Sequence, residues 1–263
     1  MPSVALTIAG SDPSGGAGIQ ADLKTFHAFG VYGAAVVATL TVQNTTGVRA
    51  VRSLDAEWVA AELAAVLDDL PVRAAKTGLL VSAPVIETVA DAFVGRSVSH
   101  LVVDPVFAAT NGTPLVDAAA RTALRTRLLP LATLVTPNLA EAEALLGVPV
   151  RDLRAMRAAA QRLVELGASA ALVTGGHLDG PPWDVLYAGG TWCELPGARI
   201  VTPGTHGTGC TLSAAITAGL AAGRPLDEAV ARAKQYVTRA LASATPIGRG
   251  NRPLDHHAPV EDP

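Results

Sequence analysis

Short apolar segments alternate along the chain with longer segments in which apolar residues recur every three or four positions. Short apolar runs of this kind predict buried strands, and the wider spacing predicts amphipathic helices. The alternation is typical of the α/β class, in which helices cover both faces of a mostly parallel sheet. The predicted strands are residues 4–9, 35–41, 74–77, 101–104, 134–136 and 170–174, and the clearest helices are residues 59–70, 153–163 and 226–237.

Residues 183–188 and 191–195 predict an exception to the parallel pattern. Only Gly189 and Gly190 separate these two strand-like segments, so we expect an antiparallel hairpin at one edge of the sheet. The length of 263 residues favours a single domain, which we assign to residues 1–248. Residues 249–263 are rich in proline, histidine and acid and show no periodicity, which predicts a loosely packed tail.

The composition excludes several classes of protein. Hydrophobic residues make up 49% of the chain and charged residues 16%, which allows a large core and excludes disorder for most of the length. The net charge is −3 without a basic run, which argues against a nucleic-acid partner. No apolar stretch reaches the roughly 20 residues that span a bilayer, and the first residues lack the basic leader of a signal peptide. Two cysteines are too few for a disulfide framework, so we expect a reducing cytoplasm.

The basic residues are mostly arginine. Only three of the 20 are lysines, and because alanine is also abundant, we attribute this bias to genomic base composition.

Polar residues follow three of the predicted strands. Asp104 ends one strand, Thr136 and Asn138 follow the next, and Thr174 ends a third. Because open parallel sheets bind ligands at the carboxyl ends of their strands, we expect these residues to converge on one crevice. Glu141 lies three residues after Asn138 at a predicted helix start, where a purely capping role is the alternative to ligand binding.

A glycine-rich loop, GTHGTGCT at residues 204–211, directly precedes a predicted helix. Gly207, Thr208 and Gly209 can turn successive backbone N–H groups toward one anion, which the helix dipole also favours. We therefore predict a phosphate cradle, with an ordinary glycine-rich turn as the alternative. The same field is expected to lower the pKa of Cys210 and make it a candidate base or nucleophile, with an inert buried thiol as the alternative. Cys193, on a predicted strand, is expected to be a small buried hydrophobic residue.

A second glycine-rich loop, residues 10–18, follows the first strand. Within it, residues 16–21 (GAGIQA) match the dinucleotide fingerprint, so a nicotinamide-dependent oxidoreductase is the alternative from another reaction class. However, the match begins seven residues after the strand, and the next strand ends in Gln43 and Asn44 where an acidic ribose ligand is expected. The Gln43 amide both donates and accepts, which suits the edge of a heteroaromatic ring, although a turn-capping role is the alternative. The histidines show no metal-ligand spacing, which favours surface or local hydrogen-bonding roles.

Taken together, these segments resemble the hydroxymethylpyrimidine/phosphomethylpyrimidine kinases of thiamine biosynthesis, within the ribokinase-like superfamily. The resemblance covers essentially the whole chain and implies a three-layer α/β/α sandwich. The matching segments are LTIAGSDPSGGAGIQADLKT at 6–25, TVQNT at 41–45, KTGL at 76–79, VDPV at 103–106, TPNLAE at 136–141, GGH at 175–177 and THGTGCTLS at 205–213.

The resemblance implies two ATP-dependent phosphoryl transfers in one site, with Mg²⁺ as the cofactor of ATP. The first modifies the hydroxymethyl oxygen of 4-amino-5-hydroxymethyl-2-methylpyrimidine, and the second converts the monophosphate to the diphosphate. By resemblance, the pyrimidine is bound by Gln43, Asp12, Ala17, Leu79 and Val106, and magnesium-ATP by Asp104, Asn138, Glu141 and Thr174. Gly207, Thr208 and Gly209 hold the transferred phosphate, and Cys210 stands where sugar kinases of the superfamily place an aspartate base.

The chain departs from the family pattern in several positions. Many relatives have lysines where this chain has Thr174 and Thr110, which would leave more of the phosphate charge to arginine or Mg²⁺. Leu79 replaces a common methionine of similar volume, which should keep the pocket apolar. A pyridoxal or pyridoxine kinase is the alternative within the superfamily, and the resemblance further implies a homodimer.

Overall fold

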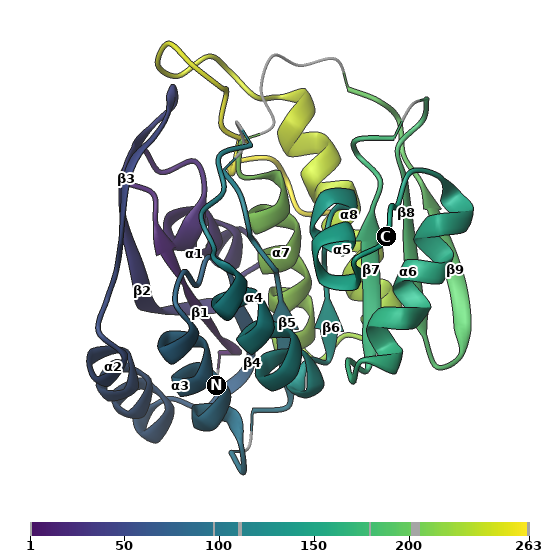
Figure 1. Ribbon diagram of the computed structural model, residues 1–263. Helices are drawn as coiled ribbons and strands as arrows, with labels where there is room; N and C mark the ends of the chain where they lie inside the picture. Colours follow the sequence, from purple (N-terminus) through teal and green to yellow (C-terminus); the bar gives the residue numbers. More distant parts are fainter. Residues whose placement is uncertain (1, 97, 110–111, 179, 201–205, 262–263) are drawn as a thin grey trace.

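The computed structural model describes residues 2–96, 98–109, 112–178, 180–200 and 206–261. These residues form one nine-stranded sheet in the order β3-β2-β1-β4-β5-β6-β7-β8-β9 (Figure 1). The six central strands, β2 to β7 in this order, are parallel, while β3 pairs antiparallel with β2, and β8 and β9 complete an antiparallel edge. The strands are β1 (Val4–Ser11), β2 (Tyr32–Asn44), β3 (Gly47–Ser53), β4 (Val72–Thr77), β5 (His100–Val103), β6 (Leu134–Val135), β7 (Ala170–Thr174), β8 (Trp183–Ala188) and β9 (Thr191–Pro196).

The predicted strands and the predicted hairpin are confirmed, but strand β3 was not expected. β3 lies at the edge of the sheet, and four of its seven residues, Arg49 to Arg52, are exposed in succession, so the strand has no alternating buried face. An edge strand with exposed side chains lacks the periodicity from which strands are recognised. The sheet therefore has an antiparallel strand at each edge rather than at one.

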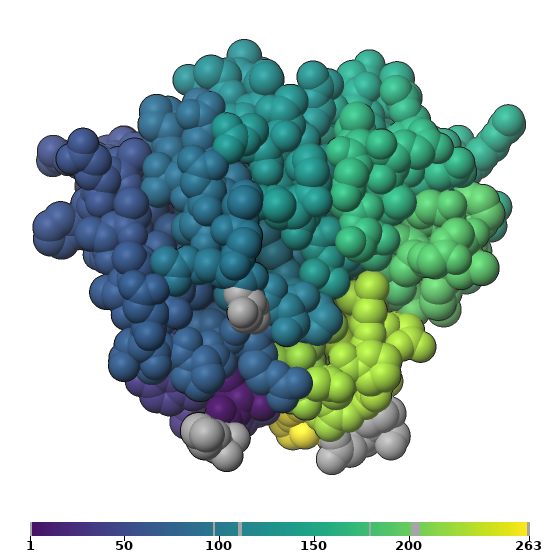
Figure 2. Space-filling model, turned by 90° about the horizontal axis from the view of Figure 1, so that it is seen from below, coloured from purple at the N-terminus to yellow at the C-terminus, as the bar shows by residue number. Residues whose placement is uncertain are grey.

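Helices cover both faces of the sheet, as the α/β pattern predicts. Helices α1, α7 and α8 pack on one face through a buried apolar cluster, and α2 to α6 pack on the other through a second one. Seen from the end opposite the loops that follow the strands, α2, α3 and α6 follow one another across one side, and the yellow-green segment of α8 lies on the other (Figure 2). The helices are α1 (Gly18–Ala28), α2 (Ala56–Asp69), α3 (Ala83–Phe93), α4 (Ala118–Ala123), α5 (Leu139–Leu146), α6 (Leu153–Glu165), α7 (Thr208–Ala221) and α8 (Leu226–Ala242), with a π-helix at Leu124–Leu128 and a 3₁₀ helix at Leu129–Leu131.

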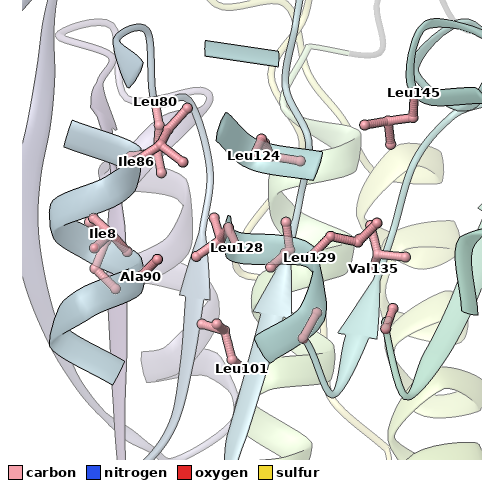
Figure 3. Packing of buried hydrophobic residues seen from close by; sticks show 14 of the residues in the cluster. Ile8, Leu80, Ile86, Ala90, Leu101, Leu124, Leu128, Leu129, Val135 and Leu145 are labelled. Atoms are coloured by element: carbon pink, nitrogen blue, oxygen red, sulfur yellow. The ribbon is translucent and has the colours of Figure 1, made fainter. Parts of the chain in front are cut away.

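The two cores follow from the alternation of side chains along each central strand. In β1, Leu6 and Ile8 join the core beneath α2 to α6, whereas Ala5 faces α1, α7 and α8. In β5, Val103 faces the core beneath α2 to α6, and Val102 faces the core beneath α1, α7 and α8. Figure 3 shows part of the larger core, in which Ile8 of the sheet lies beside Ile86 and Ala90 of α3, and Leu128 of the π-helix lies above Leu101 in this view. Because both faces are buried, the strands read as continuous apolar runs.

Helix α7 is buried along almost its whole length, from Thr211 to Ala221. Its small residues allow close packing: a Cβ added to Gly219 would lie 2.9 Å from the Cβ of Ala229 on α8. This packing holds the first turn of α7 at the carboxyl ends of the strands. Among the described residues, no helix has both the length and the apolar character that crossing a membrane requires.

The C-terminal segment differs from the loosely packed tail that its composition predicts. Leu254 and Ala258 are buried in the core shared by α1, α7 and α8. The Asp255 N–H donates to Ala240 O at 3.0 Å, and the Tyr236 hydroxyl donates to His256 O at 3.1 Å. The segment therefore packs on α8, because its two apolar residues, Leu254 and Ala258, are buried against that helix and its neighbours.

Candidate active site

The first turn of α7 lies between the loop after β1 and the end of β5. Gly207 is the N-cap of α7 with a φ of +84°, and a Cβ built on it would lie 1.9 Å from Gly16 O. A Cβ built on Gly209 would lie 4.0 Å from Asp104 Oδ2. Glycine is therefore required at position 207 by backbone conformation and by space. α7 therefore begins at the place where the sequence predicts a phosphate cradle, and anion binding at this helix N-terminus stays a prediction. Gly204 and Thr205 of the same predicted loop lie outside the described residues.

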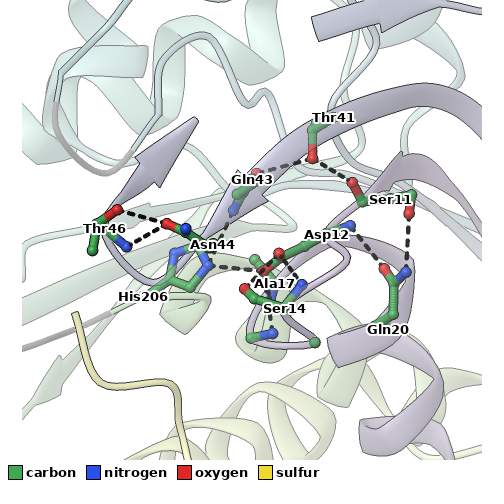
Figure 4. A network of polar contacts seen from close by, with 12 residues as sticks. Ser11, Asp12, Ser14, Ala17, Gln20, Thr41, Gln43, Asn44, Thr46 and His206 are labelled. Atoms are coloured by element: carbon green, nitrogen blue, oxygen red, sulfur yellow. Dashed lines mark hydrogen bonds and ion pairs between the residues drawn. The ribbon is translucent and has the colours of Figure 1, made fainter. Parts of the chain in front are cut away.

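Asp12 organises the loop between β1 and α1. Its Oδ1 accepts from Ser14 N at 2.9 Å and from the Ser14 hydroxyl at 2.7 Å, and its Oδ2 accepts from Gly16 N at 3.1 Å and Ala17 N at 2.9 Å (Figure 4). Burial alone would raise the pKa of Asp12, but hydrogen bonds from His206 and Ser14 outweigh it and lower the pKa to about 2. The ionised carboxylate of Asp12 thus fixes the conformation of this loop through its hydrogen bonds.

His206 joins three segments that are far apart in the sequence. Its Nε2 lies 2.9 Å from Asp12 Oδ2 and 3.2 Å from Gln43 Nε2 at the end of β2 (Figure 4). Gln43 Oε1 accepts from the Thr41 hydroxyl at 3.3 Å. The histidine is buried, while Gln43 is partly exposed. Sequence reasoning expected only a local hydrogen-bonding role for His206, because its two partners lie 194 and 163 residues away.

The apolar candidates for the ring pocket lie close to these loops. A Cβ on Gly10 would lie 3.4 Å from Leu79 Cδ2, and the Thr39 hydroxyl donates to Leu79 O at 3.4 Å. Leu79 is thus adjacent to the ends of β1 and β2. Val106 follows Asp104 by two residues, and its N–H donates to Asp104 O at 2.9 Å. Ala17, Leu79 and Val106 are all partly exposed, as residues lining an open pocket would be.

The polar residues that follow β5, β6 and β7 come together as the sequence predicts. Asn138 pairs with Thr174 in an isolated parallel bridge, and Thr174 N donates to Pro137 O at 2.9 Å. Asn138 and Glu141 form a capping box for α5: Asn138 Oδ1 accepts from Glu141 N at 3.0 Å, and Glu141 Oε2 accepts from Asn138 N at 2.8 Å. Capping therefore does account for one oxygen of Glu141.

The electrostatics of Glu141 show more than a cap. Burial and the negative charge of Asp104 raise the pKa of Glu141 to about 8. Burial also raises the pKa of Asp104, although the Lys76 ammonium opposes that shift. Asp104 is buried and Glu141 is partly exposed, and the charge of Asp104 acts on Glu141, so that bringing positive charge to these two carboxyl groups is favourable.

A buried cation lies behind Asp104. Lys76 on β4 is 0% exposed, and its Nζ donates to Asp22 Oδ1 of α1 at 2.9 Å. The same Nζ lies 3.9 Å from Asp104 Oδ2 and 3.5 Å from Cys210 O in the first turn of α7. The Ser213 hydroxyl donates to Asp104 Oδ2 at 3.0 Å. Sequence reasoning missed Lys76 as a site residue, although a lysine within the short apolar strand 74–77 was the available signal.

The two cysteines differ from their predictions. Burial raises the pKa of the Cys210 thiol to about 12, and the Lys76 ammonium offsets only part of this shift. The expected lowering of the Cys210 pKa by the helix N-terminus is therefore wrong, because desolvation and the nearby carboxylates disfavour the thiolate. Cys193 is exposed rather than buried, since it lies on β9 at the outer edge of the sheet.

Comparisons with known proteins agree with this geometry. The family model described as phosphomethylpyrimidine kinase matches residues 12–255. The chain is 50% identical over 260 residues to a hydroxymethylpyrimidine/phosphomethylpyrimidine kinase of Rhizobium meliloti, covering 97% of each protein. It is 48% identical to the thiamine biosynthesis bifunctional protein ThiED of Geobacter sulfurreducens, covering 98% of this chain but only 53% of that protein, so the chain spans about half the length of this relative.

A solved structure, an ADP complex of a Bacillus subtilis pyridoxal kinase, superposes with a TM-score of 0.90 at 39% identity and covers 98% of both chains. The fold is thus ribokinase-like, as the resemblance implies. These matches favour the kinase interpretation over the nicotinamide-dependent alternative. From the helix N-terminus, the paired carboxyl groups and the sequence matches together, the chain belongs to the phosphomethylpyrimidine kinase family.

Proposed function

We propose that this chain transfers the γ-phosphoryl group of ATP to the hydroxymethyl oxygen of 4-amino-5-hydroxymethyl-2-methylpyrimidine, and then a second phosphoryl group to the monophosphate. Its relatives carry the names of such kinases. The observation that carries the proposal for this site is a convergence of three segments. His206, two residues before α7, has its Nε2 3.2 Å from Gln43 Nε2. A Cβ built on Gly209, in the first turn of α7, would lie 4.0 Å from Asp104 Oδ2.

In each transfer the acceptor oxygen bonds to the γ-phosphorus, the bond from that phosphorus to the β–γ bridging oxygen breaks, and ADP leaves. This chemistry demands positioning and charge neutralisation more than covalent work by the protein. The backbone N–H groups of Gly207, Thr208 and Gly209 are suited to the oxygens of the transferred group. The Cys210 thiolate accepts the alcohol proton, and because the pKa of the thiol is raised to about 12, this form is scarce at neutral pH.

Asp104, Asn138, Glu141 and Thr174 are proposed to bind magnesium-ATP. Mg²⁺ prefers oxygen ligands and is usually held by one or two carboxylates together with phosphates and water. Asp104 and Glu141 fit this preference, because both offer carboxylate oxygens. Burial and the negative charge of Asp104 raise the pKa of Glu141 to about 8, so a cation beside the two groups is electrostatically favourable. When bound, the ion supplies neutralisation of charge on the phosphate oxygens.

Gln43 is proposed to pair with the aminopyrimidine edge, with Ala17, Leu79 and Val106 against the ring. Asp12 contributes indirectly, because its oxygens already accept hydrogen bonds from the loop and from His206. The likeness to a pyridoxal kinase supports a second candidate substrate, another ring that bears a hydroxymethyl group.

Coupled ADP-release kinetics with the pyrimidine alcohol, its monophosphate and pyridoxal test these assignments. We expect turnover with both pyrimidines and a kcat/KM for pyridoxal at least tenfold lower. Gln43→Leu should raise KM for the pyrimidine alcohol and leave KM for ATP within twofold. Turnover with pyridoxal alone would overturn the pyrimidine assignment and leave the kinase assignment intact.

A homodimer and a cytoplasmic location remain proposals. The exposed apolar residues Leu40 and Val42 of β2 lie on the outward face opposite Thr41 and Gln43, which supports a contact with a second copy. Both cysteines are free, which supports a reducing compartment. Light scattering of the parent and of Val42→Glu tests the dimer: we expect twice the chain mass of 26.7 kDa for the parent and a shift toward monomer for the variant.

A further inference from the structure

The cluster around Lys76 unites three segments of the site. Lys76 itself is 0% exposed and Asp22 is also fully buried. Asp22 accepts from the ammonium at 2.9 Å through Oδ1 and from the Thr7 hydroxyl at 2.6 Å through Oδ2. The ammonium also donates to the Cys210 carbonyl at 3.5 Å. One cation thus links α1, β4 and the beginning of α7.

Folding stability does not account for such a cluster. A buried ion pair gives up the hydration of both ions, and replacing it by apolar residues of similar volume is often neutral or stabilising. The residues beside Lys76 on β4 include Ala74 and Ala75, which are buried without any charge. The contacts of the Lys76 ammonium with Asp104 and with the first turn of α7 therefore indicate why a charge is kept at this position.

The two carboxylates are unequal partners of the ammonium. Asp22 takes the direct hydrogen bond at 2.9 Å, whereas Asp104 Oδ2 stays at 3.9 Å and accepts instead from the Ser213 hydroxyl. Asp104 therefore lies in the field of a fixed positive charge without giving it a short hydrogen bond. This leaves the Asp104 carboxylate available to a ligand.

We propose that Lys76 is a positioning residue for phosphoryl transfer, which holds Asp104 and the first turn of α7 in one geometry, while Asp22 holds the ammonium away from Asp104. The kinetic part of this inference rests on the proposed function, but its nucleotide-binding part does not. Removal of the Asp22 charge leaves Asp104 as the nearest carboxylate for the ammonium, so Asp104 should turn toward Lys76 and become less available to nucleotide.

Asp22→Asn is the decisive variant, because its amide can still accept from Lys76 and donate to the Thr7 hydroxyl. We expect Kd for ADP with Mg²⁺, measured by calorimetry, to rise about tenfold, within the 10- to 100-fold range seen when outer partners of metal ligands are removed. KM for the pyrimidine alcohol should change less than twofold. Asp68→Asn, which removes the carboxylate of an exposed ion pair with Arg96, is the matched control and should bind as the parent does.

Lys76→Met and the double variant Lys76→Met/Asp22→Asn separate positioning from stability. The single variant leaves a buried carboxylate unpaired, so its Tm should fall. The double variant should recover Tm, yet its kcat should stay about 10- to 100-fold below the parent. Recovery of kcat together with Tm would overturn the proposal, as would parent-like ADP binding by Asp22→Asn. If the parent binds ADP but does not turn over the pyrimidine alcohol, the proposed function fails, and calorimetry still decides the role of Lys76.

Discussion

Replacement of Gly207 by alanine tests the close contact on which the phosphate site depends. The added Cβ would lie 1.9 Å from Gly16 O, whereas real Cβ contacts are not shorter than 3.0 Å. The first turn of α7 and the loop after β1 must therefore separate by roughly 1 Å, and a displacement of this size at a reacting centre costs about 10² in rate. The φ of +84° adds a strain of roughly 1–2 kcal/mol for a residue with a side chain.

Gly223 provides a matched control at the other end of α7. Its φ is +83°, so alanine suffers the same backbone strain there, but the nearest atom to an added Cβ is Arg73 Nη2 at 3.7 Å, an ordinary contact. Both variants should lose about 1–2 kcal/mol of unfolding free energy from strain. Only Gly207→Ala should lose the further factor in turnover, because only that Cβ forces two loops of the site apart.

The assay combines ADP release at saturating substrates with thermal unfolding of both variants. We expect kcat of Gly207→Ala to fall by about 10² or more, and kcat of Gly223→Ala to remain within twofold of the parent. Equal kcat values in the two variants, at similar Tm, would refute the claim that the approach of residues 207 and 16 positions the reacting groups.

Three further predictions follow from the pKa shifts. Because the pKa of Cys210 is about 12, a thiolate base requires kcat to rise about tenfold per pH unit near neutrality. Cys210→Ala should lower kcat by about 10² to 10⁴. A kcat of the parent that does not change with pH contradicts this role. The pKa of Asp12, lowered from 3.8 to about 2, contributes about 2 kcal/mol of stability that is present above pH ~5 and lost as the pH falls toward 2, so urea unfolding of Asp12→Asn should lack this dependence. The pKa of Glu141 is raised from 4.5 to about 8, so between pH 4.5 and pH 8 the folded chain binds more protons than the unfolded chain, and its stability falls as the pH rises. Glu141→Gln keeps the capping acceptor and should abolish this fall in stability. An unchanged fall in the variant would exclude Glu141 as its source.

Local patterns were sufficient for the central strands and for the glycine-rich turn of the site. The run at residues 170–174 coincides with β7, and the glycines at 207 and 209 begin α7 beside Asp104 as expected. The strand and the turn are both determined by residues close in sequence, through the spacing of apolar residues and through backbone conformation. Strand β3 lacks such a signal because its exposed edge position requires no apolar face.

Properties that depend on distant partners could not be read from the sequence. His206 reaches Gln43 across 163 residues, and Lys76 reaches Asp22 across 54. The pKa of Cys210 was predicted in the wrong direction, because the helix dipole is a local feature whereas burial and nearby carboxylates arise only on folding. A motif can thus name a reactive group without fixing its ionisation state.

The three lysines require a different explanation from the abundance of arginine. Lys24 donates to Gly15 O at 2.7 Å, and Lys234 holds Asp184, whose Oδ1 accepts from Gly175 N at 2.9 Å in the loop after β7. With Lys76, each lysine contacts a loop or a strand end, whereas Arg96 pairs with Asp68 at the surface. Base composition accounts for how many lysines remain, but not for where they remain.

The physical difference between the two cations explains this placement. An ammonium directs several hydrogen bonds from one compact atom, whereas a guanidinium needs a planar space. Lys24→Arg should therefore leave Tm nearly unchanged, since Lys24 is exposed, whereas Lys76→Arg must force a larger group into a place with no exposed surface and should lower Tm by several degrees. Equal Tm values for these two variants would show that the buried site accepts either cation, and the distribution of lysines would then carry no chemical meaning.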